Sequence, residues 1–171
     1  MKCSICSLLV LGLVAFAPIG LAKGPEGLNN LDDALKKAKD ESKLLFIKSG
    51  RQSCGNCQAL AELIRSKKLR LPEKDFVFVD LNCDDPDQDR PFSQRYNLGG
   101  GTLPFVVIAD SDGELLCSRK GYGEKKDFDK LIQEAKKKAK EKAKLNAKDA
   151  KDKLGAKPGD QPDDKAPDGN K

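Results

Sequence analysis

The chain has 171 residues, of which 35% are charged and 38% are hydrophobic, and its formal net charge is +5. The excess positive charge lies near the C-terminus. Residues 23–124 hold 16 basic and 17 acidic side chains, whereas residues 125–157 hold 13 lysines and six acidic residues. The nearly neutral central part argues against a nucleic-acid-binding surface there. The chain has no histidine, which excludes Ser–His–acid and Cys–His hydrolytic chemistry.

The first residues have the pattern of a secretory signal peptide. Lys2 supplies the basic start, residues 7–16 form a short apolar segment, and residues 20–22 (Gly-Leu-Ala) have the small side chains that a signal peptidase reads. We therefore expect residues 1–22 to be a signal peptide and the protein to be exported, either periplasmic or secreted. The alternative is an uncleaved membrane anchor, although the apolar segment is short for a span, which needs about 20 residues.

The remainder is expected to contain one domain, at residues 25–138, which is an ordinary domain size. Residues 139–171 are expected to form a lysine-rich helical extension and a disordered tail. Beyond Pro158 the chain has no large apolar residue, so burial cannot offset the entropy of ordering it. The lysine-rich segment is interpreted as a solvated helix face, with contact to an anionic polymer or a cell surface as the alternative.

Within the domain, short apolar segments alternate with segments of helical periodicity. Continuous rather than alternating apolar character is typical of strands buried on both faces. This order, with a final hairpin and helix, predicts an α/β fold in which helices flank a central mixed sheet. In chain order we expect strands at 44–48, 76–81, 105–109 and 114–119, and helices at 31–42, 54–66 and 92–96, with a last helix after Gly123.

A Cys-x-x-Cys motif, Cys54-Gly55-Asn56-Cys57, lies where the first strand gives way to the second helix. At a helix N-terminus, unpaired backbone N–H groups and the helix dipole favour a thiolate and can lower a cysteine pKa to about 3.5–7.5. The second cysteine, three residues on, lies on the same helix face and can form a disulfide with the first. We therefore interpret the motif as a redox pair.

A zinc site is the alternative use of such a motif. Without histidine, Cys83 and Cys117 would have to complete it. The expected sheet separates their strands by three spacings of about 4.8 Å, more than a disulfide or a shared metal site can span. We therefore expect no metal. Cys117 is expected in the core, and Cys83 is either a small apolar filler or a third thiol near the motif.

Two further segments accompany the motif: residues 94–98 (Gln-Arg-Tyr-Asn-Leu) with glycines before Thr102-Leu103-Pro104-Phe105, and an Asp112-Gly113 turn followed by Gly121. Together with the Cys-x-x-Cys segment they resemble the thioredoxin superfamily over about residues 29–133. Residues 33–43 are similar to exported bacterial thioredoxin-like proteins in particular.

The resemblance implies a thioredoxin fold and a thiol–disulfide oxidoreductase. Cys54 would attack a protein disulfide and Cys57 would resolve the mixed disulfide. A cis bond would precede Pro104. No cofactor would be needed, the protein would be a monomer, and a redox partner, possibly membrane-bound, would recycle the pair. The residues implied in substrate binding are Gly55, Asn56, Leu103 and Pro104.

The sequence departs from the family pattern in two places. Family members often have tryptophan before the first cysteine, whereas this chain has Arg51-Gln52-Ser53 and no tryptophan. Many carry a buried acid on the preceding strand, where Ile47 or Lys48 falls here, so proton transfer would use water, Asp80 or no dedicated group. Arg51 is expected either to favour the Cys54 thiolate or to be a solvated cation. Two alternatives therefore stay open: a peptide-binding or chaperone-like module, and a secreted interaction protein with a structural disulfide.

Overall fold

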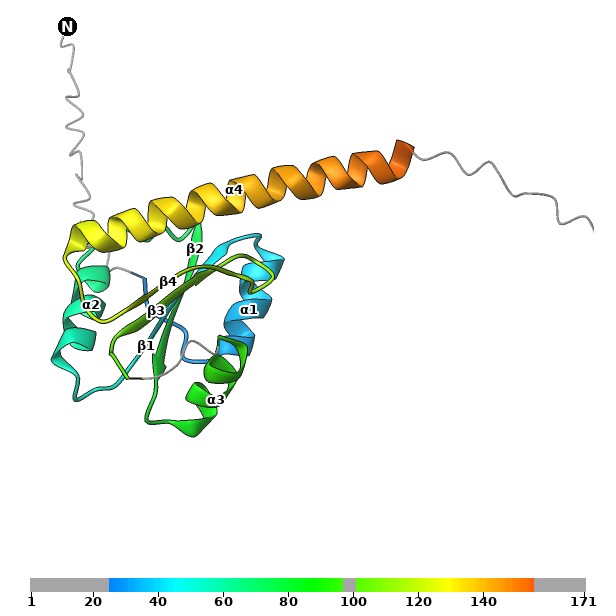
Figure 1. Ribbon diagram of the computed structural model, residues 1–171. Helices are drawn as coiled ribbons and strands as arrows, with labels where there is room; N and C mark the ends of the chain where they lie inside the picture. Colours follow the sequence, from blue (N-terminus) through cyan, green and yellow to red (C-terminus); the bar gives the residue numbers. More distant parts are fainter. Residues whose placement is uncertain (1–24, 97–100, 156–171) are drawn as a thin grey trace, which may run out of the picture.

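The computed structural model describes residues 25–96 and 101–155. These residues form four helices and four strands, in an order close to the one expected from the sequence (Figure 1). The elements are α1 (Leu31–Asp40), β1 (Leu44–Gly50), α2 (Gly55–Arg65), β2 (Phe76–Asn82), α3 (Pro86–Arg95), β3 (Phe105–Ala109), β4 (Leu115–Lys120) and α4 (Lys125–Gly155).

The four strands form one mixed sheet in the order β2-β1-β3-β4. Strands β1 and β2 are parallel, whereas β3 is antiparallel to both β1 and β4. This arrangement confirms the expected α/β fold. It also confirms that Cys83, which follows β2, and Cys117, on β4, are separated by three strand spacings.

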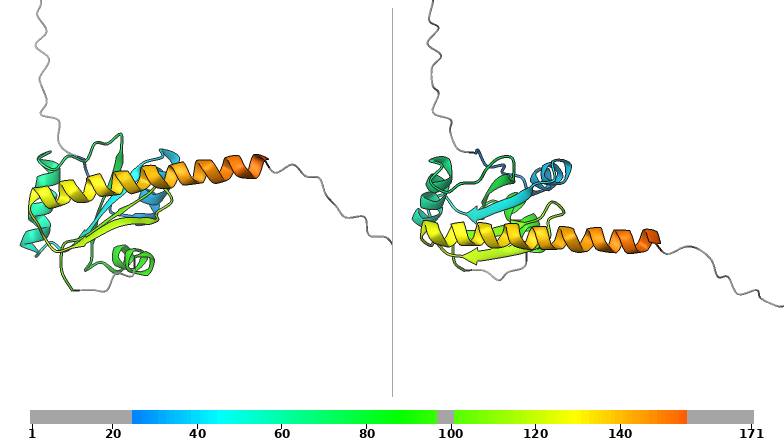
Figure 2. Two further views of the ribbon diagram at one scale, coloured as in Figure 1. Left: turned by 45° about the horizontal axis from the view of Figure 1, so that its top comes forward. Right: turned by 90° about the horizontal axis from the view of Figure 1, so that it is seen from above.

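Helices cover both faces of the sheet, with α1 and α3 on one face and α2 and α4 on the other (Figures 1 and 2). Alternation along β1 explains this, because successive side chains point to opposite faces of a strand. Leu45 and Ile47 pack with α1 and α3, whereas Phe46 packs with α2 and α4. The central strands are therefore buried on both sides, as their continuous apolar character predicted.

Helix α3 begins earlier than predicted, at Pro86 instead of near Phe92. The Asp85 side chain caps it by accepting a hydrogen bond from the Asp87 N–H at 3.0 Å. Proline is well tolerated in the first turn because its missing N–H would have no partner there. The expectation was wrong because Pro86 and Pro91 were both interpreted as marks of irregular chain, whereas Pro91 lies inside the helix.

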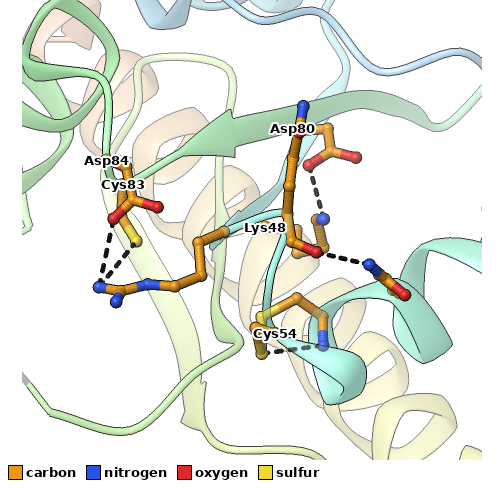
Figure 3. The surroundings of a disulfide bond; sticks show 9 residues. Lys48, Cys54, Asp80, Cys83 and Asp84 are labelled. Atoms are coloured by element: carbon orange, nitrogen blue, oxygen red, sulfur yellow. Dashed lines mark hydrogen bonds and ion pairs between the residues drawn. A yellow bond between two sulfur atoms is a disulfide. The ribbon is translucent and has the colours of Figure 1, made fainter.

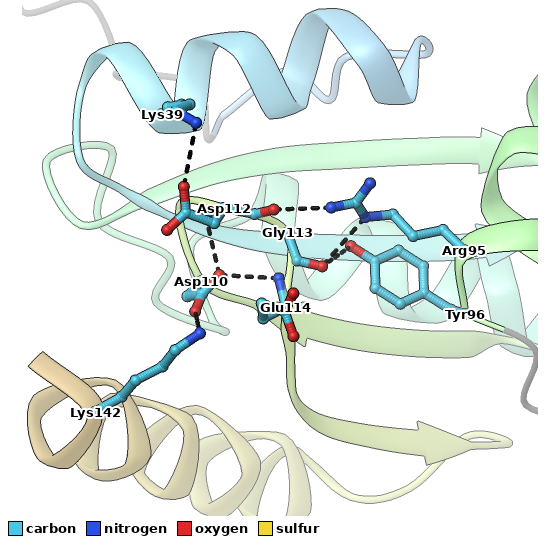
Figure 4. A network of polar contacts seen from close by, with 8 residues as sticks. All are labelled: Lys39, Arg95, Tyr96, Asp110, Asp112, Gly113, Glu114 and Lys142. Carbon is cyan, nitrogen blue, oxygen red and sulfur yellow. Dashed lines mark hydrogen bonds and ion pairs between the residues drawn. The ribbon is translucent and has the colours of Figure 1, made fainter. Parts of the chain in front are cut away.

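The turn between β3 and β4 is built around the Asp110 carboxylate (Figure 4). One oxygen accepts hydrogen bonds from the backbone N–H groups of Asp112, at 3.0 Å, and Glu114, at 2.9 Å. Gly113 has a φ of 78°, a conformation that favours glycine. The Asp112-Gly113 pair therefore forms the tight hairpin turn that the sequence predicted.

Helices on both faces of the sheet hold this turn against the body of the domain (Figure 4). From the end of α3, Arg95 and the Tyr96 hydroxyl both donate hydrogen bonds to the Gly113 carbonyl, at 3.2 and 3.1 Å. From α4, the Lys142 ammonium lies 2.6 Å from an Asp110 oxygen, and this hydrogen bond raises the pKa of Lys142. The hairpin is thus connected to elements on both faces of the sheet.

Helix α4 packs on the sheet only along its first part. Phe128, Ile132 and Ala135 are buried, whereas Leu145 is 61% exposed. Figure 2 shows the helix projecting beyond the sheet. It continues without interruption past residue 138, where the sequence analysis placed the end of the domain, so that boundary stays a prediction.

The predicted signal peptide, residues 1–22, lies outside the described residues, as does the tail from residue 156. In residues 25–96 and 101–155, no helix has both the length and the apolar character needed to cross a membrane.

Candidate redox site

Cys54 and Cys57 form a disulfide at the N-terminus of α2 (Figure 3). Cys54 is the N-cap residue of α2, and its sulfur accepts a hydrogen bond from the Cys57 N–H at 3.2 Å. The Cα atoms of the two cysteines are 5.2 Å apart, within the usual range for a disulfide. The pairing expected from the sequence is therefore confirmed, while the attacking and resolving roles of the two sulfurs stay predictions.

The two cysteines differ in exposure. Cys54 is partly exposed at the rim of the helix, whereas Cys57 is 1% exposed. Behind Cys57 lies Gly50, the last residue of β1, where a side chain would meet the Cys57 sulfur. Because Cys57 is sealed between the helix and the strand, Cys54 is the sulfur of this pair that another protein can approach.

Replacing Gly50 with alanine tests how tightly the disulfide is packed. An added Cβ would lie 2.7 Å from the Cys57 sulfur and 3.0 Å from its Cβ, so the strand or the disulfide would have to move. We expect the oxidised variant to lose about 1–3 kcal/mol of unfolding free energy, the usual cost of overpacking. The measurement is urea unfolding of the oxidised proteins.

Gly55→Ala is the matched control, since it adds the same methyl group one residue after Cys54. An added Cβ at Gly55 would meet no atom within 4 Å, and alanine is favoured over glycine in a helix by roughly 0.5–1 kcal/mol. We expect this variant to be as stable as the parent or slightly more stable. A Gly50→Ala variant equally unaffected would contradict the tight packing described here.

The loop before β3 lies at the same edge of the sheet as the disulfide. Ser49 pairs with Phe105 in the antiparallel register of β1 and β3, so the end of β1 and the start of β3 lie side by side. The bond between Leu103 and Pro104 is cis, as the resemblance predicted. The Pro104 carbonyl accepts a hydrogen bond from the Gly121 N–H at 2.9 Å.

The structure thus brings the implied substrate-binding residues to one edge of the sheet. Asn56 and Gly55 are exposed in the first turn of α2, Leu103 is partly exposed, and Pro104 is buried. Their part in substrate binding stays a prediction. Residues 97–100, which include part of the approach to Pro104, lie outside the described residues.

An ion pair with a buried lysine lies near the disulfide (Figure 3). The Lys48 ammonium is 2.6 Å from an Asp80 oxygen, and the Lys48 side chain is 7% exposed. The two residues are register partners on the parallel strands β1 and β2. Lys48, Asp80 and Cys57 line one cavity of about 450 Å³.

Lys48 occupies the position at which the resemblance implies a buried acid. Ile47 packs in the core with α1, on the opposite face of β1, so the residue beside the disulfide is Lys48. Asp80, the carboxylate considered for proton transfer, is bound to this lysine. The sequence analysis missed the ion pair, although one charged residue in each of two adjacent apolar strands was a usable signal.

Arg51 lies against Cys83 and Asp84. Its guanidinium is 3.4 Å from an Asp84 oxygen and 3.9 Å from the Cys83 sulfur, and these contacts raise the pKa of Arg51, with Cys83 the larger cause. The sequence analysis did not foresee these two partners of the guanidinium. The expected effect of Arg51 on the Cys54 thiolate stays a prediction.

Among residues 25–96 and 101–155, Cys83 and Cys117 are free thiols, and they occupy different environments. The Cys83 N–H donates a hydrogen bond to the Gly50 carbonyl at 2.8 Å, which places Cys83 at the edge of the sheet that carries the disulfide. Cys83 is partly exposed. Cys117 is 6% exposed, and burial raises the pKa of its thiol. Cys117 is therefore a core residue, as expected.

Three features together define a protein of the thioredoxin class. They are a mixed sheet between two helical layers, a Cys-x-x-Cys disulfide that opens a helix, and a cis-proline at the same edge of the sheet. A family model described as "Thioredoxin-like domain" matches residues 31–136. The chain belongs to this family, and its Cys54–Cys57 pair supports a thiol–disulfide redox role.

Solved structures support the fold. A mutant thioredoxin from Halobacterium salinarum is 17% identical, with a TM-score of 0.50 over 64% of this chain and 88% of that one. The short form of thioredoxin f from spinach chloroplast is 19% identical, with a TM-score of 0.50 over 68% of this chain and 96% of that one. At these identities the similarity concerns the fold alone. No curated protein matches the sequence.

Proposed function

We propose that this protein is a thiol–disulfide oxidoreductase that acts on protein cysteines outside the cytoplasm. The observation that supports this most is the asymmetry of the disulfide: Cys54 is partly exposed at the N-terminus of α2, and Cys57 is sealed behind it. An enzyme of this kind needs one sulfur that substrates can reach and a second that reacts only with the first.

The chemistry follows from this arrangement. In the reduced protein, the Cys54 thiolate attacks a substrate disulfide, a mixed disulfide forms, and one substrate thiolate leaves and takes a proton from solvent. Cys57 then loses its proton, attacks the Cys54 sulfur, and releases the second substrate thiol. Two electrons have then passed from the dithiol to the substrate, and the reverse sequence would oxidise a substrate dithiol.

The backbone amides that open α2 support the first step. The Cys54 sulfur already accepts a hydrogen bond from the Cys57 N–H in the disulfide form. The same N–H and the positive end of the helix dipole would stabilise a negative charge on Cys54 after reduction. No organic cofactor is required, because the two sulfurs carry the electrons.

Export and the redox partner are parts of the same proposal. The N-terminal residues 1–22 have the sequence pattern of a signal peptide, and an oxidising compartment would return the pair to the disulfide unless a partner reduces it. We propose a monomer that is served by a membrane-linked electron donor or acceptor. Fractionation of cells that express the full chain would test export, which a cytoplasmic uncleaved product would refute.

The activity is tested by insulin reduction with dithiothreitol as the electron source. The protein without residues 1–22 should accelerate the precipitation of the insulin B chain in a concentration-dependent way. A rate equal to that of dithiothreitol alone would contradict the proposal. Binding of unfolded peptide that persists in the Cys54→Ser/Cys57→Ser variant, without catalysis by the parent, would instead identify a peptide-binding module.

A further inference from the structure

The strand that supports the disulfide carries a buried cation. Residues two apart on a strand point to the same face, so Lys48 and Gly50 share the face of β1 on which the Cys57 sulfur rests. Two residues along a strand span about 7 Å. The Lys48 side chain is 7% exposed, so little water screens its charge from the neighbouring sulfur.

Asp80, the counter-ion of Lys48, is more exposed to solvent than Lys48 is. Asp80 lies on β2, one strand further from Gly50, and its side chain is 37% exposed compared with 7% for Lys48. Water screens the carboxylate more strongly than the ammonium. The positive end of the ion pair, on the strand that packs against Cys57, is therefore less screened than the negative end.

Two further cations line the same cavity as Cys57. They are Arg51, from the loop after β1, and Arg65, from the last turn of α2, and each is paired with a carboxylate outside the lining, Asp84 and Glu62 respectively. Asp80 is the single acidic side chain among the described residues that line this cavity. The lining of this cavity thus carries three cations and one carboxylate.

We propose that Lys48 is a positioning residue that stabilises the negative charge which reduction places on the sulfur pair and so makes this disulfide a stronger oxidant. The proposal rests on the redox function proposed above and gives it a direction. Reduction converts the disulfide, two electrons and one proton into one thiolate and one thiol. Stabilising the thiolate favours the reduced form and raises the reduction potential.

Lys48 would also assist the resolving step. When Cys57 attacks the mixed disulfide, its proton leaves to solvent and its sulfur carries a transient negative charge. The bond between Cys54 and the substrate sulfur breaks as the Cys54–Cys57 bond forms, and the departing thiolate is protonated by solvent. A buried carboxylate in the place of Lys48 would instead act as a proton acceptor and oppose the thiolate.

The test is the equilibrium constant of the purified domain with reduced and oxidised glutathione at pH 7. We expect Lys48→Met, which keeps the length of the side chain without its charge, to shift this constant about tenfold towards the disulfide form. For a two-electron couple this equals a reduction potential lower by about 30 mV. The control Arg65→Met removes a half-exposed cation from the same cavity and should shift the constant less than threefold.

A second variant separates the effect of the Lys48 charge on the redox equilibrium from any effect on folding. Exchanging the pair, Lys48→Asp with Asp80→Lys, keeps an ion pair in the same place but reverses its polarity. We expect this double variant to shift the glutathione equilibrium further towards the disulfide than Lys48→Met does. Unfolding curves would show which variants are folded, and a folded exchange variant with the parent's equilibrium constant would overturn the proposal.

A third readout measures Cys57 directly. In a Cys54→Ser/Cys83→Ser background, thiolate absorbance at 240 nm at neutral pH reports Cys57, because burial raises the pKa of the Cys117 thiol. Adding Lys48→Met should lower the thiolate fraction at neutral pH about tenfold, and an unchanged fraction would contradict the proposal. These equilibria need no substrate protein, so a failure of insulin reduction with the expected shifts would refute the proposed activity alone.

Discussion

Replacing Cys54 with serine should abolish insulin reduction, with a rate at least about 10³-fold below that of the parent. A hydroxyl at this position cannot form the mixed disulfide, so the covalent route is lost as a whole. The serine can still cap α2, because its oxygen can accept the hydrogen bond that the Cys57 N–H now donates to sulfur. Activity and stability are therefore separable at this position.

Cys57→Ser should behave differently, because the exposed sulfur remains. Attack on substrate proceeds but resolution does not, so the mixed disulfide with Cys54 should accumulate and be visible as a covalent adduct by mass spectrometry. Cys83→Ser is the control, since Cys83 lies at the same edge of the sheet without belonging to the disulfide. Turnover that survives Cys54→Ser, or that is lost equally in Cys83→Ser, would contradict the assigned roles.

Phe128→Ala should lower the free energy of unfolding by about 3–5 kcal/mol, the usual cost of deleting a buried aromatic ring. Phe128 belongs to the first part of α4 and is fully buried, in the cluster that includes Phe46. Its ring also lies 6.1 Å from the Tyr122 ring and 5.6 Å from the Arg119 guanidinium carbon. Urea unfolding of the oxidised proteins measures this loss.

Leu145→Ala is the control on the same helix. Leu145 is 61% exposed, and surface substitutions usually change stability by less than about 0.5 kcal/mol. The comparison tests whether α4 is bound to the domain through its first part only. Equal losses for the two variants would contradict this description, because they would mean that the projecting part of α4 is also buried.

Much of the fold was predictable because few sequence signals compete in the core. Residues 44–47 and 76–79 are continuous apolar segments, too short for helices and buried on both faces, and they became the parallel pair β1 and β2. The Asp112-Gly113 turn fixed the hairpin of β3 and β4. The helix predicted from residue 31 begins there because the Asn30 side chain accepts hydrogen bonds from the N–H groups of Asp32 and Asp33.

The features that were missed depend on contacts between distant residues or on competing local signals. The start of α3 at Pro86 was hidden because proline favours both irregular chain and the first turn of a helix. The Lys48–Asp80 pair required the register of two strands, which their composition does not specify. The position of Arg51 depended on the turn after β2, where Cys83 and Asp84 attract its guanidinium.

The proposed redox chemistry depends on Cys54 being held as a reachable thiolate by the amides that open α2. We would measure the pH dependence of iodoacetamide alkylation of Cys54 in the reduced protein, followed peptide by peptide with mass spectrometry. We expect the rate at Cys54 to reach half its maximum below about pH 7.5. A half-maximum near pH 8.5, the value of an ordinary thiol, or no alkylation of Cys54 at any pH, would contradict it.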